Sequence, residues 1–94
     1  MSIYDQIAER IIKEQELLIG PIAWYEAGKV EGLVVKDNKK GIVAVNAKNG
    51  GAVVNKLVDR FTNIFGRAGQ EVCKESVSAL IADMQPSQIP ASLK

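Results

Sequence analysis

The sequence predicts an α+β fold in which four amphipathic helices pack with a central two-stranded antiparallel β-hairpin, in the order ααββαα. Apolar residues recur at helical spacing in the first and last thirds of the chain, and two short valine-rich runs lie between them. A glycine, Gly20 or Gly66, interrupts the apolar pattern on each side of these runs. We therefore expect two helix-Gly-helix hairpins around one hairpin of strands.

The first helix pair is expected over residues 3–19 and 21–30. Ser2 and Asp5 have the spacing of a capping box, with Asp where Glu or Gln is usual, and apolar residues follow at helical spacing. Gly20 tolerates the left-handed conformation that ends a helix, and Pro21 suits the first position of the next one. Similar glycine breaks in both halves suggest two related helical hairpins, although any two amphipathic helices broken by glycine align this well.

The valine-rich runs, Leu33–Val35 and Ile42–Val45, predict two strands joined by a polar turn over residues 36–41. A two-stranded hairpin is marginally stable by itself and leaves unpaired backbone at both edges. Because these strands are apolar on both faces, exposure of one face is unfavourable. We therefore expect pairing across a two-fold axis, which would make a four-stranded sheet from two copies of the chain.

The second helix pair is expected to begin near Asn49, to break at Gly66 and to end near Met84. The last ten residues contain Pro86 and Pro90 and little periodic pattern, which predicts an extended tail. The expected organisation is a single globular domain over residues 1–84 and a C-terminal tail over residues 85–94.

Length and composition favour a small globular protein. The 94 residues are 47% apolar and 24% charged, and the net charge of +1 provides no global field to attract nucleic acid or an anionic membrane. The single cysteine, Cys73, cannot form an internal disulfide, and the apolar runs are too short to span a bilayer. We expect a soluble, cytoplasmic protein without membrane insertion.

Residues that usually carry chemistry are scarce. The chain contains no histidine, which removes the usual general base, the usual zinc ligand and the Ser-His and Cys-His nucleophile arrangements. Cys73 lies on the apolar stripe of its predicted helix, which favours core packing over reactivity. Glu71 and Glu75 are four residues apart and are expected to form a solvated helix face. We expect no enzyme activity, catalytic residue, cofactor or metal.

The leading functional hypothesis is a small adaptor or regulatory module that binds protein, as a homodimer or with another protein partner. Trp24 and Tyr25 are adjacent on a short helix, so their side chains point about 100° apart and one of them should be partly exposed. Both residue types often anchor interfaces, although a single tryptophan is also commonly a core residue. The expected interface consists of Trp24, Tyr25, Leu33, Val35, Ile42 and Val43.

The alternative hypothesis is nucleic-acid binding by a lysine-rich hairpin. Its candidate anion or nucleic-acid patch consists of Lys36, Lys39, Lys40 and Lys48, with Asp37 as the opposing charge. No arginine lies in this stretch to read bases with paired hydrogen bonds, and lysines at a sheet edge also prevent aggregation. The segment Lys48–Gly51 precedes a predicted helix and could hold an anion, but it lacks the spacing of a phosphate-binding loop. The sequence favours a solvated edge.

Overall fold

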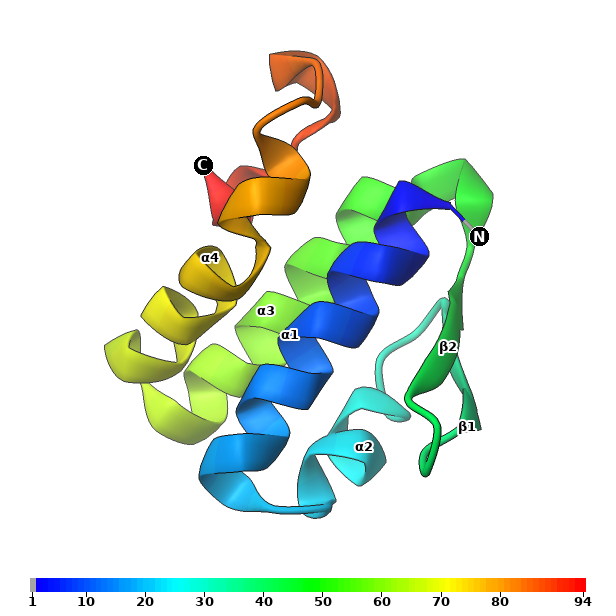
Figure 1. Ribbon diagram of the computed structural model, residues 1–94, viewed down its shortest axis with the longest axis vertical. Coiled ribbons are helices and arrows are strands. Elements are labelled where there is room, and N and C mark those ends of the chain that lie inside the picture. Colours follow the sequence, from blue (N-terminus) through cyan, green and yellow to red (C-terminus); the bar gives the residue numbers. More distant parts are fainter. Residues whose placement is uncertain (1) are drawn as a thin grey trace.

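The computed structural model describes residues 2–94, whose elements follow the predicted order ααββαα and confirm the α+β class (Figure 1). The helices and strands have these bounds: α1 Ile3–Ile19, α2 Ile22–Ala27, β1 Leu33–Asp37, β2 Ile42–Val45, α3 Gly50–Phe65 and α4 Arg67–Ile81. Short 3-10 turns follow β2, at η1 (Ala47–Asn49), and follow α4, at η2 (Pro86–Gln88) and η3 (Ala91–Leu93).

Helix α1 is the centre of the molecule. It packs against α3 and α4 on one side and against β2 on the other, as Figure 1 shows. Its start is the predicted capping box: the Ser2 hydroxyl accepts from the Asp5 amide at 3.2 Å, and the Ser2 amide donates to the Asp5 carboxylate at 3.1 Å. Two orphan amides at the helix start are thereby satisfied.

The two predicted helix breaks have the same local structure. Gly20 and Gly66 have φ values of +81° and +65°, a backbone conformation that residues with a Cβ rarely adopt. The amide of each glycine donates to the carbonyl four residues earlier, at 2.8 Å and 2.6 Å respectively. The chain therefore reverses after α1 and after α3, which gives the two helix-Gly-helix hairpins that the sequence predicted.

Three element ends differ from the sequence prediction. Helix α2 stops at Ala27 instead of Val30, because turns over residues 28–32 include Gly28 and a positive φ of +90° at Gly32. Helix α4 stops at Ile81 instead of Met84. Strand β1 continues to Asp37, two residues beyond the apolar run, because Asp37 pairs with Ile42 after a register shift between Val35 and Asp37.

The core lies where the helices and one face of the hairpin meet. Its fully buried members from the helices include Ile7, Ile11, Leu57 and Phe61, and the strands add Leu33, Val43 and Val45. Gln15 interrupts the apolar stripe of α1 in the sequence, yet its side chain is fully buried in this core.

Residues 85–94, for which the sequence predicted an extended tail, form the turns η2 and η3, and η3 packs against α3. Leu93 is only 3% exposed, and the Ser92 amide and hydroxyl donate to the Asn55 side-chain oxygen at 3.0 and 2.6 Å. The Tyr4 hydroxyl donates to the Gln88 carbonyl at 2.9 Å. Burial of one leucine together with these hydrogen bonds gives the segment a fixed path that proline content alone does not indicate.

Across residues 2–94, no helix combines the length and the apolar character that crossing a membrane requires.

Candidate interaction site on the hairpin and helix α2

The outer edge of β2 is closed by helix α1. The Val43 amide donates to the Glu9 carboxylate at 3.2 Å, and the Val45 amide donates to the Asp5 carboxylate at 2.7 Å. Asp5 therefore uses one oxygen for its own helix cap and the other for the strand. Because these outward amides are already bonded, β2 does not offer an edge for another strand.

The outer edge of β1 is open. Since the amides of Val43 and Val45 point away from β1, their partners in the register, Val35 and Leu33, form non-hydrogen-bonded pairs with them. The bond from the Asn46 amide to the Gly32 carbonyl, at 2.9 Å, fits this alternation. The amide and carbonyl of Val35 consequently point outward, and neither has a hydrogen-bond partner within residues 2–94, whereas the outward amide of Leu33 donates to the Val30 carbonyl at 3.2 Å.

One face of the hairpin is covered by the chain's own helices and the other is not. Leu33 and Val43 lie on the covered face and are buried, and Val35 on that face is half-buried. On the uncovered face Val34 is 60% exposed and Ile42 is 37% exposed. Val34 is not among the residues of the expected interface, although strict alternation with Leu33 and Val35 places it on the opposite face.

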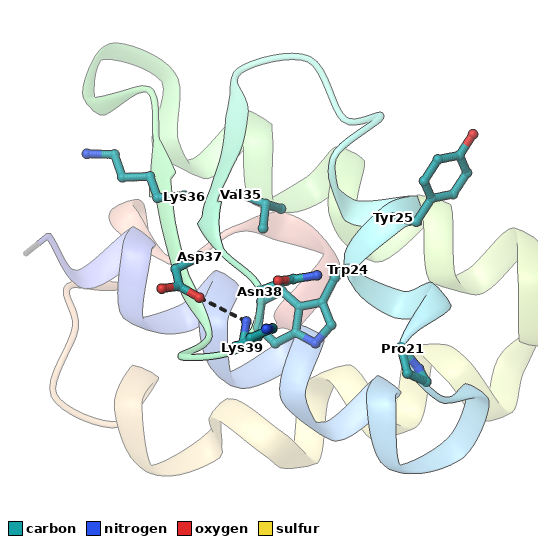
Figure 2. Close-up of a pocket in the computed structure, with 8 residues that line it drawn as sticks. All are labelled: Pro21, Trp24, Tyr25, Val35, Lys36, Asp37, Asn38 and Lys39. Atoms are coloured by element: carbon teal, nitrogen blue, oxygen red, sulfur yellow. Dashed lines mark hydrogen bonds between the residues drawn. The ribbon is translucent and has the colours of Figure 1, made fainter.

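Trp24 and Tyr25 have different environments. Trp24 is 4% exposed, and its indole N–H donates to the Glu16 carboxylate at 2.8 Å, which fixes the ring. Tyr25 is 66% exposed, and the Lys29 ammonium lies 4.5 Å from its ring centroid. Figure 2 shows Trp24 pointing from α2 toward the hairpin, whereas Tyr25 points away from it. The pair thus supplies one anchored ring and one free ring.

An open pocket of about 540 Å³ lies between α2 and the hairpin (Figure 2). Helix α2 and the residue before it contribute one wall, and the end of β1 with the following turn contributes the other. The lining residues are Pro21, Trp24, Tyr25, Val35, Lys36, Asp37, Asn38 and Lys39. The pocket therefore joins the open edge of β1 at Val35.

The four lysines of the predicted patch do not lie together. Lys36, Lys39 and Lys40 are exposed near the hairpin turn, whereas Lys48 follows the opposite end of β2 in η1. Helix α1 adds a lysine that sequence reasoning missed, because the Lys13 side chain lies against Gly41 in the turn. Periodicity could not reveal this lysine, since the contact joins residues 28 positions apart in the sequence.

Asp37 organises the turn. One of its carboxylate oxygens accepts from the amides of Lys39 and Lys40, at 3.0 and 3.1 Å, in an Asx-type turn. These hydrogen bonds hold the carboxylate in the turn, where it opposes part of the positive charge of Lys36, Lys39 and Lys40.

Titratable groups elsewhere are built into the fold. Burial raises the pKa of the Cys73 thiol to about 11, so this fully buried cysteine stays protonated at neutral pH. Hydrogen bonds from the Arg60 guanidinium, at 2.7 and 3.0 Å, hold the pKa of Glu26 below its ordinary value. Glu71 and Glu75 are exposed, and residues 2–94 contain no group of acidic or sulfur ligands arranged to hold a metal ion.

Comparison of the chain with protein-family models, with curated proteins and with solved structures finds no match in any of the three. Function is therefore inferred from the hairpin edges, the exposed face and the pocket.

Proposed function

We propose that this protein is a small non-catalytic interaction module, of the adaptor or regulatory kind, that acts as a homodimer through antiparallel pairing of its β1 strands. The observation that carries the proposal is the inequality of the two hairpin edges. Carboxylates of α1 occupy the outward amides of β2, whereas the outward groups of Val35 on β1 have no partner within residues 2–94.

The backbone pattern fixes where a two-fold axis would lie. With the axis between the two copies of Val34, each Val35 amide would face the Leu33 carbonyl of the other copy, and the Val34 residues would form a non-hydrogen-bonded pair. Each Leu33 amide would stay bonded to the Val30 carbonyl of its own chain, so one hydrogen bond of each Leu33–Val35 pair would form. The two exposed Val34 side chains would then lie on the same face of a four-stranded sheet and cover each other. The central pairs, Val34 with Val34 and Val35 with Leu33, bring no like charges together.

The closed edge of β2 supports a dimer over a larger assembly. A strand pair related by a two-fold axis uses the same surface on both copies, so one open edge per chain yields a dimer. Two open edges per chain would instead permit continued addition of chains. The capping of β2 by Asp5 and Glu9 thus favours a closed dimer over a growing sheet.

Sedimentation velocity over a range of concentrations, from about 1 to about 100 micromolar, tests the proposal. We expect the wild-type protein to shift from monomer toward dimer across this range. Val35→Pro should abolish the shift, because proline removes the outward amide without removing a hydrogen bond inside the hairpin. Val34→Lys should also abolish it, because two ammonium groups would face each other at the axis.

Leu17→Lys is the matched control, since Leu17 is 79% exposed on α1 and lies outside the hairpin. This variant should dimerise like the wild-type protein. Circular dichroism confirms that each variant is folded. A wild-type protein that stays monomeric at every concentration would refute the dimer, as would a dimer that survives Val35→Pro.

A further inference from the structure

We propose that the pocket between α2 and the hairpin turn binds an acidic peptide segment of a partner protein, with one apolar side chain of the peptide against Trp24 and its carboxylates near the lysines of the turn. The inference rests on the proposed function in that it treats the chain as a binding module. It does not depend on the β1 pairing, so the two proposals can fail separately.

The shape of the pocket suits a side chain of a peptide. Its volume of about 540 Å³ lies within the range of about 300 to 1,000 Å³ that is common for ligand sites. The indole N–H of Trp24 is already bonded to Glu16 at one edge of the ring. At the other edge Gly41 lies close to the benzo ring, since a Cβ added at Gly41 would be only 3.3 Å from it. The ring is thus held from both sides, which gives the pocket a rigid apolar floor that requires little ordering when a ligand binds.

The charge around the pocket selects an acidic partner. Lys36 and Lys39 line it, and Lys40 and Lys13 lie at the same turn. The carboxylates of Asp37 in the turn and of Glu16 beside Trp24 offset part of the charge of these four lysines. A local excess of positive charge around an apolar floor is complementary to a segment with an apolar residue flanked by Asp or Glu.

Several observations favour a peptide over nucleic acid. None of the described residues that line the pocket is an arginine, the residue that most often reads bases with paired hydrogen bonds. Tyr25 points away from the lysines and has Lys29 near its ring, so it offers no platform beside them on which bases could stack. Lys48, which could have extended a track for a phosphate backbone, lies at the other end of β2.

A fluorescence titration tests the inference, because Trp24 is the chain's single tryptophan and lies in the pocket. The probe is the blocked peptide Glu-Glu-Leu-Glu-Glu, added at low salt. We expect a saturable change in Trp24 emission that weakens as salt is added. The double substitution of Lys36→Glu and Lys39→Glu should weaken binding about tenfold, since each change replaces an attraction with a repulsion.

Lys48→Glu is the control, because it makes outside the pocket the charge change that each of the two substitutions makes inside it, and it should leave the affinity unchanged. A peptide with Ala in place of Leu tests the apolar contact and should bind more weakly, and a peptide with Lys in place of Glu should not bind. Equal binding of all three peptides, or equal weakening by Lys48→Glu, would overturn the inference.

An oligothymidine of similar charge provides the competing arm. If the oligothymidine binds, its binding is weakened by Lys36→Glu with Lys39→Glu, and the acidic peptide does not bind, then the pocket is a nucleic-acid site and the inference is wrong. Sedimentation of the same variants separates the two proposals. If peptide binding is lost while the dimer is intact, only the peptide-site proposal is wrong. If a strictly monomeric protein binds the peptide, only the dimer proposal is wrong.

Discussion

Single residues set how closely α1, α3 and α4 approach one another. Gly69 lies where α4 crosses the end of α3, and a Cβ placed on it would be 2.7 Å from the Phe61 carbonyl oxygen and 2.9 Å from the Phe65 Cβ. The Gln15 amide nitrogen of α1 donates to the Gly69 carbonyl at 3.0 Å and contacts the Cys73 sulfur at 3.4 Å. A small residue and a buried amide thus define one three-helix contact.

Gly69→Ala is expected to lower the free energy of unfolding by about 2 kcal/mol, because backbone and a Cβ, which move little, oppose the added methyl group. This loss exceeds the gain of about 1 kcal/mol that alanine brings to a helix interior. Urea denaturation measures the difference. Gly51→Ala serves as the control, since its Cβ would meet nothing closer than the Tyr4 hydroxyl at 4.0 Å. Equal stability of the two variants would contradict the close packing at Gly69.

The buried side chain of Gln15 is expected to lower the free energy of unfolding, and a substitution can test this. Its side-chain oxygen is buried without a hydrogen-bond partner, whereas its nitrogen is bonded. Gln15→Met keeps the length of the side chain and removes the unpaired oxygen, so we expect the free energy of unfolding to rise by about 1 kcal/mol. Gln15→Ala should lower it by about 2 kcal/mol because it leaves a cavity. Thermal and urea denaturation of both variants provide the test, and a large loss in Gln15→Met would show that the amide stabilises the contact.

Between elements, an ion pair joins α2 to α3. Arg60 donates two hydrogen bonds to one oxygen of Glu26, and Lys29 lies 3.4 Å from the other oxygen. Helix α2 has only six residues and could not persist by itself, so its position depends on this pair and on the burial of Trp24. The pair therefore helps to hold the pocket wall that α2 supplies.

This ion pair predicts a pH dependence. The Arg60 hydrogen bonds lower the pKa of Glu26 below its ordinary value of 4.5, so the unfolded chain takes up this proton at a higher pH than the folded one. The stabilisation is present above the unfolded pKa and is lost as the pH falls through the folded pKa. Between about pH 5 and about pH 3, the wild-type protein should lose more stability than Glu26→Gln. Glu31→Gln is the control, because its contact with Lys56 is 3.9 Å long and exposed.

Helices and strands with a clear hydrophobic periodicity were predictable from the sequence, whereas tertiary contacts were not. The apolar spacing of α1 and α3, the Ser2 cap and the glycine breaks follow from local rules, and the structure confirms them. The path of residues 85–94 depends on Leu93 reaching α3, which no local pattern encodes. Likewise, alternation shows that strand faces differ, but only the fold shows that Asp5 and Glu9 close β2 and leave β1 open.

In the whole molecule, the two faces and the two edges of the hairpin are covered unequally. The helices cover one face and one edge of the hairpin, and the other face and edge meet the solvent at Val34 and Val35. The exposed apolar residues of the helices, Leu17, Leu18, Ile22 and Ile64, lie outside the hairpin. The proposed association through the hairpin would add to a core that is already complete, so the monomer should remain folded when pairing is blocked.

Amide hydrogen exchange followed by NMR tests this arrangement at individual positions. The amides of Val43 and Val45 are bonded to carboxylates of α1, and the register directs the Val34 amide to β2, so these three should exchange slowly at every protein concentration. The Val35 amide points outward and should exchange rapidly in dilute protein. It should slow as the concentration rises, because the β1 strands pair. Slow exchange at Val35 in the most dilute sample would mean that its edge is covered within one chain, and rapid exchange at Val43 would mean that α1 does not close β2.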